Sequence, residues 1–225
     1  MSSESSIHAA DQGTALPIQS LPPAAATGTA LLPPRATSNG TLRRLQEAAL
    51  IGFCERGYHG VSTRELAQTT GVRVSSVYAH VAAKEDILLE LMVVGHEEHN
   101  SVLRQSLLSS QPEPAAQMSA LVTAHVVFHA TYPLLARVCN KELHALSAAN
   151  AERVMAVRLA SERMFLDVVT RGMEGGQFHC PDAWLAVAAI GAMGLRVAEW
   201  FDPGGPRPAH EVAGAYAEFT LKLLA

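Results

Sequence analysis

One stretch of the chain, residues 62–84, constrains the fold more than any other. It reads STRELAQTTGVRVSSVYAHVAAK. Ser62 followed by Glu65 is the pattern of a capping box at a helix start. Gly71 comes where a tight turn needs a residue that tolerates positive φ, and Val77 is spaced to pack a second helix onto the first. This spacing is typical of a helix-turn-helix unit, whose second helix enters the DNA major groove.

An ordinary pair of packed helices with an incidental glycine is the alternative interpretation of this stretch. The distribution of charge favours the DNA-binding interpretation. The whole chain carries a net charge of −4, yet residues 35–84 carry +4 and residues 85–225 carry −6. A basic end on an acidic body meets phosphates with that end only.

The chain is predicted to be all-α, with an N-terminal three-helix head that contains the helix-turn-helix and a C-terminal helical bundle. Alanine and leucine are abundant, and no alternating strand pattern occurs. Besides the two short helices of residues 62–84, we expect helices at 41–56, 84–108, 114–132, 134–146, 150–172, 182–201 and 208–224. The predicted domains are a disordered arm (1–40), the head (41–90) and the bundle (91–225).

The proline-rich arm has two interpretations. Its last basic residue, Arg35, is close in sequence to Arg43 and Arg44, so the arm could reach into a minor groove beside the head. A solvated tail without a role is the alternative, and the composition favours it.

The sequence also bears on where the protein works. Three widely spaced cysteines (Cys54, Cys139, Cys180) imply no disulfide framework and fit a reducing cytoplasm. The longest apolar run, residues 183–195, is shorter than a membrane span, and no Lys or Arg precedes Arg35 as a signal peptide would require. We therefore expect a soluble cytoplasmic protein with no membrane contact.

Residues 41–91 resemble the DNA-binding domain of the TetR family of bacterial transcriptional regulators. The resemblance rests on AALIGFCERGYHG at 48–60, STRELA at 62–67, GV at 71–72, VYAH at 77–80 and KEDIL at 84–88. It implies a homodimer that offers one recognition helix per subunit to a palindromic operator in double-stranded DNA. It also places eight side chains at the DNA: Ser62, Arg64, Arg73, Ser75, Ser76, Tyr78, His80 and Lys84.

These residue types suit DNA contacts in different ways. Arg73 can read a guanine edge, whereas Ser62, Tyr78 and Lys84 suit phosphates. The chain departs from the family pattern at four positions: Arg73 replaces a common Ser, Val74 a Lys, Val81 a Phe and Ala83 a Ser. Two helix N-caps are thereby weakened, by about 1 kcal/mol each. Val74 is expected to meet a thymine methyl in place of a phosphate.

The helix predicted at 182–201 is apolar nearly all round, so we expect it to be buried on most sides. Its small residues would let another helix approach closely. By resemblance to the family, it forms the dimer bundle with the helix at 208–224, since two half-sites on DNA need a dimer. An interior helix of a monomer is the alternative.

Candidate effector-binding residues lie on two of the predicted helices. His125, Phe128 and His129 share one face of the helix at 114–132, and Arg196 and Trp200 lie one turn apart at the end of the helix at 182–201. A guanidinium can hold a phosphate or carboxylate, and an indole can stack on a flat ring. A surface pair of Arg196 with Glu199 is the alternative.

The histidines also raise the question of a metal site or an enzyme. His125 with His129, and His96 with His99, have metal-ligand spacings, but no Cys or carboxylate falls in a matching pattern. We therefore predict buried hydrogen-bonding histidines, no metal and no cofactor. Glu97 and Glu98 beside His96 and His99 suggest acid–base chemistry, but no nucleophile elbow, phosphate loop or triad accompanies them, so no enzyme is predicted.

The C-terminal half resembles one subgroup of TetR regulators through NKELHALS at 140–147, GLRVAEWF at 194–201 and PGGP at 203–206. Members of this subgroup govern lipid, steroid or acyl-CoA catabolism and release DNA on binding an acyl-CoA thioester. The resemblance implies an acyl-CoA effector, with Arg196 and Trp200 against the CoA moiety. The resulting hypothesis is a repressor released from its operator by an effector. A regulator or activator without a small-molecule effector is the alternative.

Overall fold

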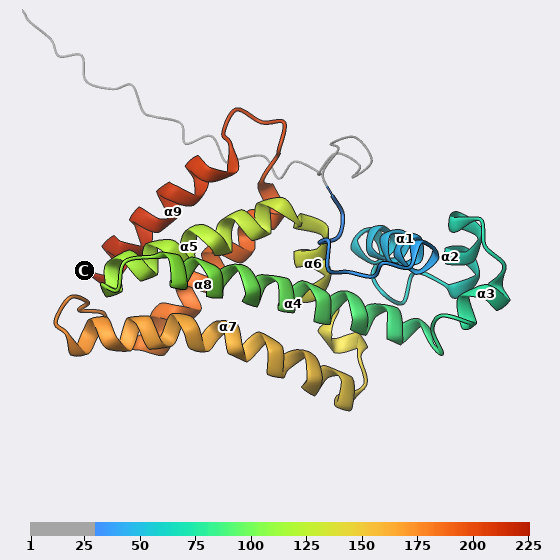
Figure 1. Ribbon diagram of the computed structural model, residues 1–225, viewed down its shortest axis with the longest axis horizontal. Coiled ribbons are helices and arrows are strands. Elements are labelled where there is room, and N and C mark those ends of the chain that lie inside the picture. The colour runs from blue at the N-terminus through green and yellow to red at the C-terminus, as the bar shows by residue number, and fades with distance from the viewer. Residues whose placement is uncertain (1–29) are drawn as a thin grey trace, which may run out of the picture.

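The computed structural model describes residues 30–225, and these residues form nine α-helices and one short 3₁₀ turn, with no strand among them. The predicted all-α class is confirmed. Figure 1 shows α1, α2 and α3 at one end, with the long α4 running from them into the remaining helices. The elements are α1 (Gly40–Arg56), α2 (Thr63–Thr70), α3 (Val74–Tyr78), α4 (Lys84–Ser109), α5 (Pro114–Thr131), α6 (Pro133–Lys141), η2 (Leu143–Ala145), α7 (Ala148–Glu174), α8 (Ala183–Trp200) and α9 (Ala209–Leu224).

The head is built from helices whose ends are set by single residues. Gly57, at φ 73°, ends α1, and Gly71, at φ 70° in the left-handed region, ends α2. These φ values strain any residue with a Cβ, which is why glycine stands at both turns. The Ser62 side chain caps α2 by accepting the N–H of Glu65. The chain can therefore turn sharply enough for α3 to cross α2.

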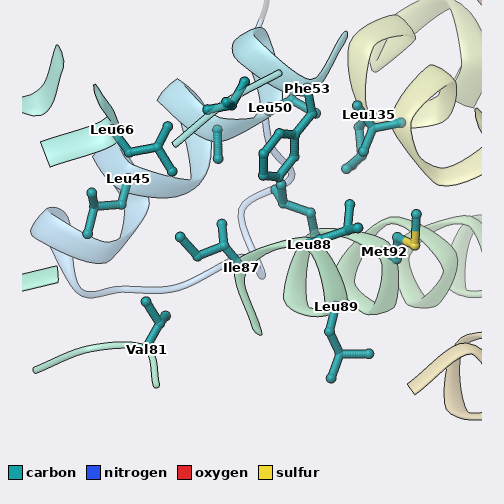
Figure 2. Close-up of a cluster of buried hydrophobic side chains, with 14 of the residues drawn as sticks. Leu45, Leu50, Phe53, Leu66, Val81, Ile87, Leu88, Leu89, Met92 and Leu135 are labelled. Carbon is teal, nitrogen blue, oxygen red and sulfur yellow. The ribbon is translucent and has the colours of Figure 1, made fainter. Parts of the chain in front are cut away.

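The head core is a cluster of buried aliphatic side chains around Phe53 of α1 (Figure 2). Leu66 of α2 and Val77 of α3 pack into it, as do Ile87 and Leu88 of α4. The cluster continues into Met92 of α4 and Leu135 of α6 (Figure 2), so the head is seated on the body by the same core that holds it together. Apolar burial of this kind is the main stabilising contribution to a small helical domain.

Residues 30–39 differ from the predicted disordered arm. Leu32 and Ala36 are buried, and the Leu32 carbonyl accepts a hydrogen bond from Arg43 Nη2 at 3.0 Å. Arg35, for which the sequence allows both a minor-groove contact and a solvated tail, forms a 2.6 Å ion pair with Glu98 of α4. We call residues 30–39 the strap, because they connect the head to α4. Residues 1–29 of the predicted arm lie outside the described residues.

Several predicted helix boundaries shift by a few residues. The first helix begins at Gly40 and is capped by Asn39, whose side chain accepts the N–H groups of Thr41 and Leu42. The helix expected at 134–146 ends at Lys141, and the short turn η2 follows it.

The body packs α4, α5 and α7 together, with α5 also covered by α8 and α9 (Figure 1). A second apolar cluster fills it, drawn mainly from α5, α7, α8 and α9. α5 and α6 meet at a bend of 98°. The body thus has its own core, separate from that of the head.

The helix α8 is more exposed than its composition predicts. Trp184 and Leu185 are 59% and 58% exposed, and Ala188, Ala189 and Ala192 on the same side are also exposed. Within the described chain α8 is also the single helix with the length and mean hydropathy of a membrane span, although the bent pair α5 and α6 would pass jointly. The helix is longer than the apolar run seen in the sequence, because it continues through Arg196 and Glu199 to Trp200. A helix that packs against a second protein chain has the same apolar composition and the same exposure when its own chain is considered alone.

Candidate functional site

The first candidate site is the outer surface of α3. Val77 is fully buried against the head core, and this fixes the rotation of the short helix about its axis. Ser75 and Tyr78 therefore face outward, with Tyr78 54% exposed, and Ser76 is half-buried. The predicted contacts Arg73 and His80 flank the helix rather than lying in it, and both are exposed.

The start of α2 adds two more of the predicted DNA contacts. The Ser62 oxygen accepts the N–H of Glu65 at 3.2 Å, which leaves its hydroxyl hydrogen free to donate to a phosphate. Arg64 is exposed beside it. The capping box is only half formed, however, because the Glu65 carboxylate pairs with Arg56 of α1. That pair ties α1 to α2 on the exposed side of the head.

The two departures at predicted N-caps have visible consequences. Arg73 caps α3 without a side-chain hydrogen bond, and Ala83 at the start of α4 has no side chain that can accept one. Asp86 supplies the other half of the box by accepting the Ala83 N–H at 2.8 Å. The start of α4 therefore has one of the two side-chain hydrogen bonds of a full capping box.

Lys84, a predicted phosphate contact, makes its hydrogen bonds within the head. Its Nζ donates to the carbonyls of Tyr58 at 2.8 Å and Val61 at 2.7 Å, and it sits 3.9 Å from the centre of the Tyr58 ring. Partial burial lowers the pKa of this ammonium. Two of its three protons are thus used inside the head, where Lys84 fastens the loop between α1 and α2 to the start of α4.

The second candidate site is a cavity of about 300 Å³ in the body, which reaches the surface at the exposed side of α8, where Trp184, Ala188 and Ala192 line it. It is lined from α4, α5, α6, α7 and α8, and its wall includes the predicted residues His125, Phe128 and His129. Arg196 and Trp200 are absent from its lining and lie exposed on α8. The proposed pairing of Arg196 with Glu199 is also not seen, since Glu199 pairs with Lys141 at 2.9 Å and with Arg137 at 3.6 Å.

The cavity also contains residues that the sequence did not indicate as effector contacts. Arg158 and Ser161 of α7 line it, as do His96 and His99 of α4. No local pattern marks Arg158 or Ser161, because only the packing of α7 against α4 and α5 brings them there. A long-range contact of this kind leaves no trace in helical periodicity.

Three histidines in the cavity wall form a hydrogen-bonded network. His99 and His125 approach to 2.9 Å between Nε2 and Nδ1. His125 Nε2 donates to the Gly191 carbonyl at 3.3 Å, and His129 Nδ1 donates to the His125 carbonyl at 2.7 Å. Because a carbonyl only accepts, His125 Nδ1 carries no proton and His99 Nε2 donates to it. His99 Nδ1 is then an acceptor for the Ser161 hydroxyl at 3.2 Å.

Burial keeps these imidazoles uncharged at neutral pH. Desolvation lowers the pKa of His125 to about 4 and that of His96 to about 4, and it lowers the pKa values of His99 and His129 well below the ordinary range. The cavity therefore presents lone pairs and N–H groups, together with the Arg158 guanidinium and the Glu162 carboxyl group in its lining. Burial also raises the pKa of Cys139 to about 12, so this thiol is not a nucleophile at neutral pH.

Close packing holds the His125 ring in place. A Cβ added at Gly194 of α8 would lie 2.0 Å from His125 Cδ2, so only glycine lets α8 approach the ring this closely. By contrast, a Cβ at Gly191, one turn earlier, would meet nothing within 4 Å.

Comparison with known proteins relates both sites to one family. Residues 45–91 match the family described as bacterial regulatory proteins of the tetR family, and residues 111–224 match the tetracyclin repressor-like C-terminal domain. The HTH-type transcriptional repressor KstR2 of Mycobacterium tuberculosis is 27% identical over 187 residues, which cover 81% of this chain and 92% of KstR2. Its structure, described as a ketosteroid transcriptional regulator, has a TM-score of 0.76 at 24% identity, covering 86% of this chain and 97% of that one.

Other solved structures agree in fold. A tetR-family regulatory protein from Rhodococcus RHA1 is 26% identical with a TM-score of 0.77, covering 84% of this chain and 98% of the other. AibR, solved with isovaleryl coenzyme A and operator DNA, shares the fold at 18% identity, with a TM-score of 0.71 and coverage of 80% and 97%. One family thus accounts for both the head and the body, and the chain belongs to the TetR family of bacterial transcriptional regulators.

Proposed function

We propose that the protein is a transcriptional repressor whose homodimer binds a palindromic operator and is released by a small-molecule effector, an acyl-CoA thioester. The observation that carries the proposal is that one uninterrupted helix, α4, connects the two candidate sites. It begins at Lys84 inside the head and contributes His96 and His99 to the cavity wall.

The surface of α3 supports DNA binding by the head. Its exposed side chains include Tyr78, Ser75 and the flanking Arg73, which are groups that contact phosphates and base edges. Exposed Val74, at 40%, lies beside them and suits a thymine methyl. We assign operator contact to Ser62, Arg64, Arg73, Ser75, Ser76, Tyr78 and His80, and we assign Lys84 to positioning of the α1–α2 loop.

The exposed apolar side of α8 and α9 supports the homodimer. Besides Trp184 and Leu185 on α8, Phe219 and Leu223 on α9 are 53% and 45% exposed. Large apolar side chains that cluster at the surface of one chain mark a surface that associates. Two identical copies of such a face form a two-fold interface, which matches the symmetry of a palindromic site.

The cavity supports the effector. Its volume is at the lower limit of small-molecule sites, which is about 300 Å³, so it suits a short acyl group or a small ring system, with the CoA moiety outside. KstR2 is described as a ketosteroid regulator, and AibR was solved with an acyl-CoA. Arg158 replaces Arg196 as our candidate for an anionic group of the effector, because Arg158 lines the cavity.

Release follows if the effector binds better to a conformation in which the two heads no longer fit both half-sites. Filling the cavity pushes on α4 at His96 and His99, and the rigid helix carries this displacement to its N-terminal end in the head. A differential affinity of about 1–3 kcal/mol is typical for such coupling.

The test is a titration of the DNA upstream of the gene, followed by fluorescence anisotropy, with and without a panel of acyl-CoA thioesters. We expect wild-type protein to bind and one class of thioester to release it, and Tyr78→Ala to bind weakly with unchanged thermal stability. Arg158→Gln should bind DNA normally and resist release, whereas Arg196→Gln should behave as wild type. Release of Arg158→Gln at wild-type effector concentrations would remove Arg158 from the effector site.

The dimer is tested by light scattering on Leu185→Glu, which we expect to be monomeric. Leu108→Glu is the matched control, because Leu108 is 81% exposed at the end of α4, outside this face. If both variants stay dimeric, the exposed face of α8 and α9 is not the interface.

A further inference from the structure

The cluster of His99, His125 and His129 brings one ring nitrogen from each residue close enough to share one ion. The three residues come from two helices, His99 from α4 and His125 and His129 from α5. One ring nitrogen from each lies within 4.8 Å of one from each of the others. Their ring centres are 4.4 to 5.6 Å apart. In the sequence, His125 has metal-ligand spacing only with His129. The packing of α4 against α5 adds the third imidazole, that of His99.

From this geometry we propose that His99, His125 and His129 bind a divalent transition-metal ion in the wall of the cavity. Three neutral imidazoles are a ligand set that zinc, cobalt, nickel and copper accept. Three protein ligands leave a further coordination position open, and because all three residues line the cavity, that position is available to a water or to a donor atom of a bound molecule.

The distal nitrogens of His125 and His129 already have the partners that metal-bound histidines use. A ligating histidine usually donates its other N–H to a carbonyl or a hydroxyl, which fixes the ring. His125 donates Nε2–H to the Gly191 carbonyl, and His129 donates Nδ1–H to the His125 carbonyl. Their remaining nitrogens, Nδ1 of His125 and Nε2 of His129, therefore carry no proton and have a lone pair available for a metal ion. Among residues 30–225, His129 hydrogen-bonds through Nδ1 and not through Nε2.

His99 needs one change before it can ligate. In the metal-free network its Nε2 carries the proton shared with His125 at 2.9 Å. When that proton is lost from Nε2 and another is held on Nδ1, the ring stays neutral and Nδ1 donates to the Ser161 hydroxyl, now the acceptor. Binding therefore releases no net proton from the three rings. The 2.9 Å separation must open to about 3.3 Å, the spacing of two nitrogens on a tetrahedral zinc ion.

The test is binding of Co²⁺ to the full chain in the absence of DNA and effector. We expect one Co²⁺ per chain, with the visible absorption of a low-coordinate nitrogen site, and displacement by Zn²⁺. His129→Gln and His99→Gln should each weaken binding at least tenfold. His96→Gln is the matched control, since His96 is a buried histidine of α4 in the same cavity but outside the cluster, and it should bind as wild type.

Because a buried substitution can disturb folding, the second measurement uses the wild type alone. X-ray absorption of the Zn²⁺ complex should show three imidazole nitrogens and one or two oxygen donors. Wild type that binds no ion, ions bound equally by His129→Gln, or a spectrum without imidazole scattering would show that the histidines only hold hydrogen bonds. These results do not depend on release from DNA, so they leave the repressor proposal to its own test.

Discussion

The two cores of the molecule are built on different principles. The head core is aliphatic and aromatic, and Gln46 is the single polar residue buried in α1–α3. The body buries seven polar side chains, four of them imidazoles: His96, His99, Asn100, His125, His129, Ser161 and Thr220. A buried polar group costs free energy unless it is hydrogen-bonded. These polar side chains therefore make the body less stable than an apolar core of the same size would be. Several of them line the cavity.

The comparison teaches where each kind of function is placed. DNA contact needs a rigid surface, so the head fills its interior and fixes α3 through Val77. Effector binding needs groups that can exchange partners, so the body places them around an internal space. The helix α4 belongs to both cores, and it is the element through which a change in one reaches the other.

The largest expected effect comes from the head core. Phe53→Ala should lower the free energy of unfolding by about 3–5 kcal/mol and abolish DNA binding, because it opens a cavity at a fully buried site. Urea unfolding measures the loss. Phe53→Leu is the control, and it should cost under about 1.5 kcal/mol. A loss below 1 kcal/mol for Phe53→Ala, taken as roughly the median of all substitutions, would contradict a well-packed head.

The second prediction is that acid destabilises the body. Unfolded histidines take up protons near pH 6.5, whereas His96 and His125 stay neutral in the fold until about pH 4. The stability is full above pH 6.5 and is lost as the pH falls toward 4, by about 1.4 kcal/mol per pH unit for each group. Both tryptophans lie on α8, so their fluorescence reports the body. Urea midpoints in chelator that agree at pH 7.5 and 5.5 would refute this prediction.

The third prediction concerns the contact between α8 and His125. Gly194→Ala should destabilise by about 1–3 kcal/mol, because its Cβ overlaps the ring. Gly191→Ala on the same helix meets nothing within 4 Å and should be neutral or stabilising by up to about 1 kcal/mol. Thermal unfolding of the two variants side by side measures the difference. Equal melting temperatures would mean that the ring can move aside.

The smallest effect is a gain of stability. Ala83→Ser supplies the missing acceptor at the start of α4 and should stabilise by about 1 kcal/mol. Ala82→Ser, an exposed neighbour outside the cap, should change nothing. If both serines have the same effect on the urea midpoint, the half-formed box is already sufficient.

Local sequence patterns predicted the helices well but pointed to only part of the cavity wall: His125, Phe128 and His129 line the cavity, and Arg196 and Trp200 do not. Capping residues, glycines and apolar spacing act over a few residues, so α2, the turn at Gly71 and α4 follow directly from them. His99, His125 and Arg158 meet only because three long helices pack in one particular register. Arg196 and Trp200 were assigned to the effector from their types and spacing, yet the rotation of α8, set by Gly194 on His125, turns them outward.

The strap bears on how separable the head is from the rest of the protein. Residues 41–91 look like a module that could be exchanged between regulators, but Leu32 is part of the head core and Arg35 pairs with Glu98. The Tyr58 N–H also donates to Glu142 of the body at 3.2 Å. A hybrid regulator that received only residues 41–91 would lose all of these contacts, because Leu32, Arg35 and Glu142 lie outside that segment. A functional graft would begin at residue 30 and carry the matching surfaces of α4 and α6 with it.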